Sequence, residues 1–97
     1  MPIRQLIKSL IDKNKVFVFS KSYCPYSDRA KNTLSSLNIP FKSLELDTEQ
    51  NGPEIQETLY QMTNQRTVPN IFINRQHIGG NDSLNDLVLQ DKLKNML

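Results

Sequence analysis

The chain has 97 residues, with 12 Lys and Arg against 10 Asp and Glu, a formal net charge of +2, one cysteine and one histidine. This length predicts a single domain over residues 1–97, and the interspersed charges are typical of a solvated surface rather than of a nucleic-acid interface. One cysteine excludes an internal disulfide framework, and one Cys with one His excludes a closed structural zinc site within one chain.

The first half of the chain predicts a helix, a buried strand and a second helix. Apolar residues recur at the spacing of one helical face over residues 3–11, which predicts an amphipathic helix. The apolar run 16–19 predicts a central strand that is covered on both faces. A polar loop leads to Cys24, and Pro25 suits the first turn of a helix because its missing N–H is no loss there. We expect this helix to end near Leu37.

The second half predicts three more strands and three more helices. In order, we expect a strand at 41–46, a helix at 53–62, a strand at 71–73, a hairpin turn at 74–76, a strand at 77–78, a helix capped by residues 81–83, and a last helix carrying Leu93 and Leu97. A helix joins the first two strands, which predicts a parallel pair, and the last two form an antiparallel hairpin. This order predicts an α/β fold, a four-stranded mixed sheet with helices on both faces.

Cys24 stands between the buried strand and a helix, and this position favours a reactive thiol. The positive end of a helix dipole stabilises a thiolate over a thiol, and Lys21 and Arg29 add positive charge nearby. The alternative is a buried, inert cysteine that packs as a small hydrophobic residue. The polar loop before Cys24 and the tyrosines beside it favour the reactive interpretation.

Three segments resemble the glutaredoxin family, and the resemblance covers the whole chain. Residues 20–26 are similar to the lysine-to-cysteine segment, residues 65–73 to the T-V-P segment, and residues 77–82 to the glycine-pair segment. Within the first, residues 24–27, Cys-Pro-Tyr-Ser, are similar to the C-P-Y-C active site. The resemblance implies a thioredoxin-like fold and a glutathione-dependent thiol–disulfide oxidoreductase that serves electron transport and cell redox homeostasis. It is closest to the dithiol class, because the monothiol class usually carries C-G-F-S and a longer preceding loop.

Ser27 departs from the dithiol pattern, in which this position holds the resolving cysteine. Serine is nearly isosteric with cysteine but cannot attack a disulfide. Ser27 is either the natural residue or the product of a cysteine-to-serine substitution, and the sequence leaves both open. In both cases the resemblance implies a monothiol route, in which Cys24 takes the glutathionyl group from a mixed disulfide and a second glutathione releases it.

The resemblance also implies where glutathione, the co-substrate, would bind. The backbone of Thr67, Val68 and Pro69, with Pro69 in cis, would pair with the cysteinyl part of the peptide, as in strand addition. The alternative is that Pro69 merely begins a strand. Tyr26 would pack beside the sulfur and shape the groove.

Polar positions would hold the two ends of glutathione. The positions matching ligands of the glycine carboxylate are Lys21, Gln56 and Arg66. Gly79 and Gly80 allow close backbone approach and positive φ, and Asn81 and Asp82 match the residues that hold the γ-glutamyl group. Helix-start amides would take its carboxylate and Asp82 its amine. The alternatives are ordinary solvated side chains and, for Asp82, a plain N-cap.

A second function stays open beside the enzyme. Some glutaredoxins hold a [2Fe–2S] cluster between two subunits, each giving one cysteine, with two glutathiones giving the other thiolates. Pro25 argues against this, since cluster-binding members often carry a smaller residue there. We therefore expect a monomer without a resident metal, acting on glutathionylated or disulfide-containing proteins.

The sequence also predicts a cytoplasmic location. Its longest apolar run, residues 16–19, is far too short to span a membrane, so no membrane partner is expected. The N-terminus has no long apolar segment of a secretory signal. A lone cysteine suits a reducing compartment.

Overall fold

The structure, a computed structural model, describes residues 2–97. Its helices are α1 (Ile3–Lys13), α2 (Pro25–Ser36), α3 (Gly52–Thr63), α4 (Asn81–Leu89) and α5 (Leu93–Met96). Its strands are β1 (Val16–Ser20), β2 (Lys42–Glu45), β3 (Asn70–Ile73) and β4 (Gln76–Gly79). They form one sheet in the order β2-β1-β3-β4, with β1 parallel to β2 and with β3 antiparallel to β1 and β4. The predicted mixed sheet is confirmed.

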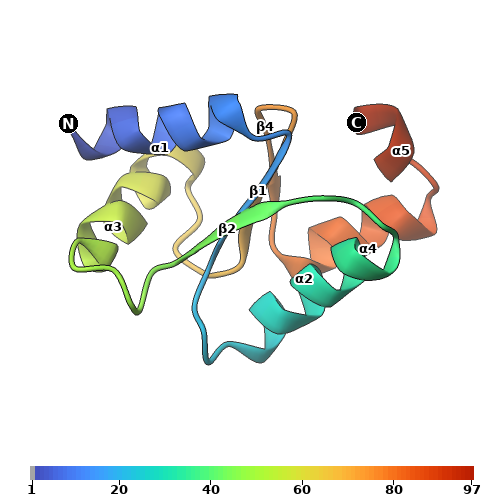
Figure 1. Ribbon diagram of the computed structural model, residues 1–97, viewed down its shortest axis with the longest axis horizontal. Helices are drawn as coiled ribbons and strands as arrows, with labels where there is room; N and C mark the ends of the chain where they lie inside the picture. Colours follow the sequence, from blue (N-terminus) through green and yellow to red (C-terminus); the bar gives the residue numbers. More distant parts are fainter. Residues whose placement is uncertain (1) are drawn as a thin grey trace.

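Helices cover both faces of the sheet because the side chains of β1 alternate between two apolar clusters. Phe17 and Phe19 pack against α1 and α3, whereas Val16 and Val18 pack against α2 and α4. Every residue of β1 is buried, as the unbroken apolar run predicts for a central strand. Figure 1 shows the resulting layers, with α1 and α3 on one side of the sheet and α2 and α4 on the other.

Two boundaries around β2 differ from the prediction. Pairing with β1 runs from Lys42 to Glu45, so the strand is shorter than 41–46. Leu46 is buried just beyond it. A Cβ on Gly52 would stand 1.9 Å from the Leu46 carbonyl oxygen, so only glycine fits at this contact. The helix α3 begins at this glycine, one residue before the predicted start.

The hairpin between β3 and β4 has a shorter turn than predicted. Asn74 and Arg75 alone form it, with φ values of 50° and 70°. Positive φ at both central residues is the requirement of a type I′ turn, whose twist matches that of the strands it joins. Gln76 already pairs with Ile73 in the sheet.

The predicted cap of α4 is wrong. The N-cap residue is Gly80, in extended conformation, and no side chain caps this helix. Asn81 and Asp82 already belong to its first turn, because the backbone changes direction earlier, at Gly79 with φ of 120°. The Asp82 carboxylate is therefore not used as a cap and stays exposed.

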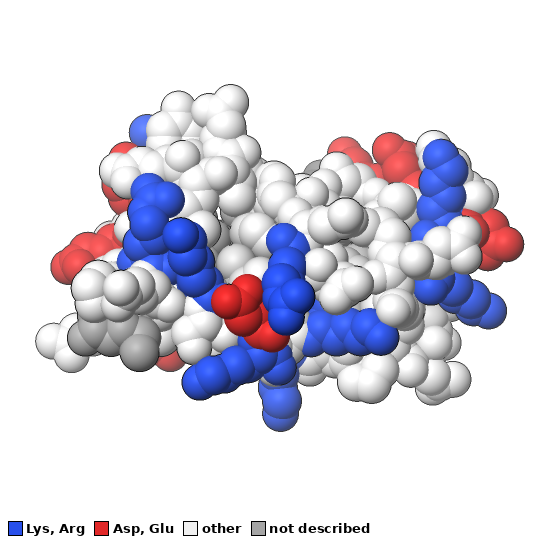
Figure 2. All heavy atoms as spheres, turned by 90° about the horizontal axis from the view of Figure 1, so that it is seen from above, with Lys and Arg blue, Asp and Glu red and all other residues white. Residues whose placement is uncertain are grey.

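The interspersed charges of the sequence are not spread evenly over the folded surface. Figure 2 looks onto α1 and shows Lys and Arg side chains gathered there and over the neighbouring turns. This face is not the one that carries the start of α2, which lies at the bottom of Figure 1. Among residues 2–97 no helix is both long and apolar enough to cross a membrane.

Candidate active site around Cys24

Cys24 is the N-cap residue of α2, directly after the loop that leaves β1. Its backbone is extended, with φ of −89° and ψ of 116°, and Pro25 follows in the first turn. The Cys24 carbonyl accepts the first helical hydrogen bond, from the Asp28 N–H at 3.1 Å. The thiol is free and partly exposed. The predicted position at a helix start is therefore confirmed.

The pKa of the Cys24 thiol is lowered from its ordinary value of 9.0. Burial acts in the opposite direction and raises the pKa, and so does the charge of Asp28. The Ser27 hydroxyl, the Ser27 N–H and the Tyr26 N–H outweigh both, because they are donors that favour the thiolate form of the sulfur. The first turn of α2 thus stabilises the thiolate through its own donors.

Of the two cations expected near the sulfur, Lys21 lines the same cavity as Cys24, whereas Arg29 stacks on Tyr26. The Arg29 guanidinium lies 5.2 Å from the centre of the Tyr26 ring, a cation–π distance. Hydrogen bonds from the Ser22 hydroxyl and N–H lower the pKa of Asp47, and the charge of Lys21 adds to this. The Ser22 N–H donates to Asp47 Oδ1 at 2.9 Å, so Asp47 braces the loop before Cys24.

Ser27 lies beneath the thiol on the inner face of α2. It is fully buried, and its hydroxyl oxygen makes no hydrogen bond with any residue in the range 2–97. A buried hydroxyl without a partner is unfavourable, so this donor is available to a thiolate. The position of a resolving cysteine is thus occupied by a group that stabilises the thiolate but cannot attack a disulfide.

The segment 67–69 faces Cys24 from the other side of the site. The Val68–Pro69 peptide bond is cis, as the resemblance implied. The Val68 carbonyl oxygen lies 3.8 Å from Cys24 Sγ. Within residues 2–97 the Val68 N–H makes no hydrogen bond, so this edge can still pair with a peptide.

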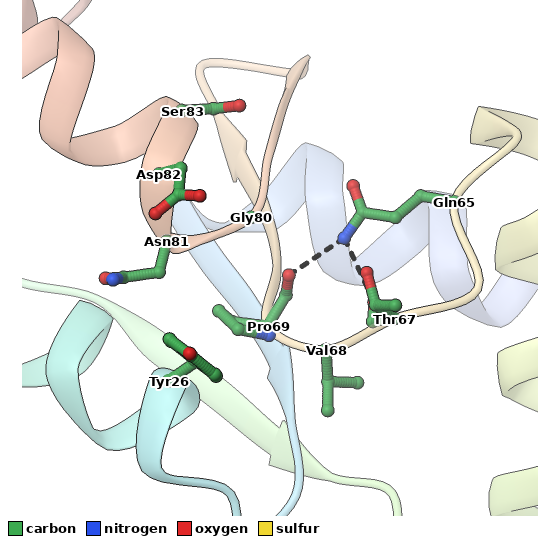
Figure 3. A pocket seen from close by; sticks show the side chains of 9 residues that line it. All are labelled: Tyr26, Gln65, Thr67, Val68, Pro69, Gly80, Asn81, Asp82 and Ser83. Atoms are coloured by element: carbon green, nitrogen blue, oxygen red, sulfur yellow. Dashed lines mark hydrogen bonds between the residues drawn. The ribbon is translucent and has the colours of Figure 1, made fainter.

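Two open cavities meet at this edge. The first, about 390 Å³, is lined by Lys21, Tyr23, Cys24, Pro25, Gln56, Arg66, Thr67 and Val68. The second, about 480 Å³, is lined by Tyr26, Gln65, Thr67, Val68, Pro69, Gly80, Asn81, Asp82 and Ser83 (Figure 3). Every residue predicted to bind glutathione lines one of them, and Thr67 and Val68 line both. The structure therefore brings these residues together, and their roles toward a ligand stay predictions.

The polar groups of the first cavity include Lys21 from the loop after β1, Gln56 from α3 and Arg66 from the segment after α3. Gln56 Nε2 donates to the Arg66 carbonyl at 2.7 Å. The Arg66 guanidinium lies 3.9 Å from the centre of the Tyr60 ring and forms a 3.0 Å ion pair with Glu57. Glu57, for which no role was predicted, partly neutralises the charge that Arg66 brings to the cavity.

The second cavity ends at the start of α4. Asp82 is exposed in the first turn, and Asn81 is buried with an Oδ1 that has no partner among the described residues. The need for glycine lies at Gly79, where φ is 120° and an added Cβ would stand 2.8 Å from Ser83 Oγ. At Gly80 a Cβ would make only an ordinary contact of 3.7 Å with the Pro69 carbonyl.

The sheet is four-stranded and mixed, and helices cover both of its faces. At the start of one helix lies a thiol with a lowered pKa, and a cis-proline segment faces it. These features define a thiol-dependent oxidoreductase of thioredoxin-like fold. The comparisons with known proteins agree. The family model described as Glutaredoxin matches residues 16–78. The structure of a buckwheat glutaredoxin–glutathione complex superposes with a TM-score of 0.96 at 43% identity, covering 98% of this chain and 86% of that one.

Curated relatives give the same result. Glutaredoxin-C2 of Arabidopsis thaliana is 47% identical over 93 residues, which cover 96% of this chain and 84% of the relative. Glutaredoxin-1 of Saccharomyces cerevisiae is 46% identical over 95 residues, covering 94% of this chain and 86% of the relative. The chain belongs to the glutaredoxin family, whose members are glutathione-dependent thiol–disulfide oxidoreductases.

Proposed function

We propose that this glutaredoxin reduces protein–glutathione mixed disulfides by a monothiol route through Cys24, with glutathione as co-substrate. The observation that carries the proposal is the position of the only thiol beside the free backbone edge of Val68, where the two cavities meet. The glutathione complex of the buckwheat relative supports glutathione as the ligand.

The bound tripeptide would lie across this edge. Its cysteinyl unit pairs with the Val68 backbone, which brings its sulfur to Cys24. Its glycine carboxylate lies in the first cavity, near Lys21, Gln56 and Arg66. Its γ-glutamyl carboxylate meets the N-terminal amides of α4, and its amine meets Asp82.

The chemistry proceeds in two exchanges. The Cys24 thiolate attacks the glutathione sulfur of the mixed disulfide, a bond forms between Cys24 and glutathione, and the protein thiolate leaves and takes a proton. The thiolate of a second glutathione then attacks the glutathione sulfur bound to Cys24. Glutathione disulfide leaves and the Cys24 thiolate is restored. Ser27 takes no part as a nucleophile, since a hydroxyl does not exchange with disulfides.

Mass spectrometry after incubation with glutathione disulfide tests this proposal. We expect one glutathione on the wild-type chain, mapped to Cys24, and none on Cys24→Ser. Steady-state kinetics with a glutathionylated peptide then show turnover that depends on added glutathione and is lost in Cys24→Ser. A folded wild-type protein that takes up no glutathione contradicts the proposal.

We further propose that the protein acts as a monomer in the cytoplasm, where it passes electrons from glutathione to glutathionylated and disulfide-containing proteins in cell redox homeostasis. The single cysteine supports a reducing compartment. The alternative, a [2Fe–2S] cluster shared by two chains, would take one thiolate from each Cys24. A brown dimer with cluster absorbance after purification would support the alternative, and a colourless, active monomer would contradict it.

A further inference from the structure

We propose that Gln65, which belongs to no helix or strand, is a positioning residue that holds the Val68 edge in the shape that binds glutathione. The inference rests on the proposed function. The Gln65 side chain lies in the second cavity, between the 67–69 segment and β4, and Figure 3 shows it directed at the backbone on both sides of Val68.

One amide group ties down both neighbours of Val68. Gln65 Nε2 donates to the Thr67 carbonyl at 3.0 Å and to the Pro69 carbonyl at 2.9 Å, drawn as dashed lines in Figure 3. The Val68 carbonyl, by contrast, lies next to Cys24 Sγ. Gln65 therefore occupies the carbonyls of Thr67 and Pro69. The carbonyl and the N–H of Val68 remain available to the thiol and to a ligand.

The other end of the amide is fixed as well. Gln65 Oε1 lies 3.2 Å from Nε2 of His77 on β4, and an amide oxygen can only accept, so His77 donates. The His77 ring packs against Phe72 with ring centres 5.3 Å apart. Through His77, Gln65 connects the 67–69 segment to the sheet.

The network requires an amide at this position. Two carbonyls need two N–H donors, and the His77 donor needs an acceptor, which together are the hydrogen-bonding groups of glutamine. The Gln65 N–H also donates to Thr63 Oγ1 at 3.2 Å, which orients the residue as it leaves α3. A side chain of similar size without these groups would fill the space but would leave the Thr67 and Pro69 carbonyls without their hydrogen bonds.

The test is Gln65→Met, which keeps length and neutral charge but removes the hydrogen bonds. We expect KM for a glutathionylated peptide to rise roughly five- to tenfold, the effect of losing hydrogen bonds that order a binding edge. The pH profile of Cys24 alkylation by iodoacetamide should not move, because the donors to the sulfur lie on α2. Gln61→Met is the matched control, because exposed Gln61 makes only a 3.5 Å contact with Arg4.

His77→Phe is the second variant, because it keeps the ring against Phe72 and removes only the bond to Gln65 Oε1. We expect a smaller rise in the same KM. An unchanged KM in folded Gln65→Met, or in His77→Phe if Gln65→Met does not fold, overturns the inference. A Gln65→Met protein whose Cys24 alkylation profile shifts together with KM also overturns it, since the effect would then lie at the thiol. Failure of the wild-type chain to form the glutathione adduct would instead overturn the proposed function, and with it this inference.

Discussion

The sulfur of Cys24 lies 3.8 Å from the carbonyl oxygen of Val68, although 44 positions separate the two residues in the chain. A neutral thiol can donate weakly to that oxygen, but a thiolate cannot. Loss of the proton therefore removes the attraction to the Val68 edge. The sulfur then depends on the donors of Ser27 and Tyr26, which lower its pKa.

Ser27→Ala should raise the pKa of Cys24, because it removes the side-chain hydrogen bond to the thiolate. Alkylation of Cys24 by iodoacetamide, measured against pH, should show its midpoint at higher pH and a rate several-fold lower at neutral pH. The fold should tolerate the change, since the buried hydroxyl has no other partner among residues 2–97. Ser35→Ala, at an exposed position of the same helix, is the control, and equal profiles for both variants would argue against a role for Ser27.

Stability should rise with pH through the titration of Cys24. Its pKa is lowered in the folded state from an ordinary value of 9.0, so between these two values the unfolded chain binds a proton that the folded chain has released. The stabilisation is present above the unfolded pKa and is lost as the pH falls through the folded pKa. Urea unfolding at neutral pH and above pH 9.0 should show a rise in the free energy of unfolding that Cys24→Ser lacks. Parallel curves for the two proteins would disprove this linkage.

Glu57→Gln should tighten glutathione binding, because it leaves the Arg66 charge unpaired beside the first cavity. Exposed ion pairs contribute less than about 1 kcal/mol, so we expect KM for a glutathionylated peptide to fall by at most about fivefold. Glu54→Gln removes the same charge from the first turn of the same helix and should leave KM unchanged. A rise in KM for Glu57→Gln would mean that Glu57 positions Arg66 rather than competing for it.

Asp82→Asn should weaken binding at the opposite end. If Asp82 receives the γ-glutamyl amine, losing its charge should raise KM about tenfold, as expected for one exposed charge-assisted hydrogen bond. The change in stability should stay within about 1 kcal/mol, the contribution of a carboxylate in the first turn of a helix. Asp86→Asn on the same helix is the control, and the idea fails if both variants show the same KM.

The sheet was predictable because its signals are local. The β-branched and aromatic run from Val16 to Phe19 is typical of a buried central strand, and the hairpin around Asn74 follows from a turn residue between two apolar segments. The ends of the elements were harder. The start of α3 at Gly52 depends on contact with the Leu46 carbonyl, and such long-range packing leaves no periodic pattern.

Within the site, the residues of the segments that resemble the family were predictable. The side chains that hold those residues in position were not. Closeness in the chain predicted charge from Lys21 and Arg29 near the sulfur. Lys21 does line a cavity with Cys24, whereas Arg29 stacks on Tyr26. Gln65 stands beside the matching segment without any signal of its role. Its partners become visible only when β4 brings His77 alongside.

The buried hydroxyl of Ser27 has a consequence for how the protein responds to its surroundings. A chain whose only thiol is Cys24 cannot discharge its glutathione adduct internally. On the proposed route, the ratio of adduct to free enzyme at equilibrium follows the ratio of glutathione disulfide to glutathione. The occupancy of Cys24 would thus be a continuous readout of the glutathione pool, set by mass action rather than by an internal oxidation.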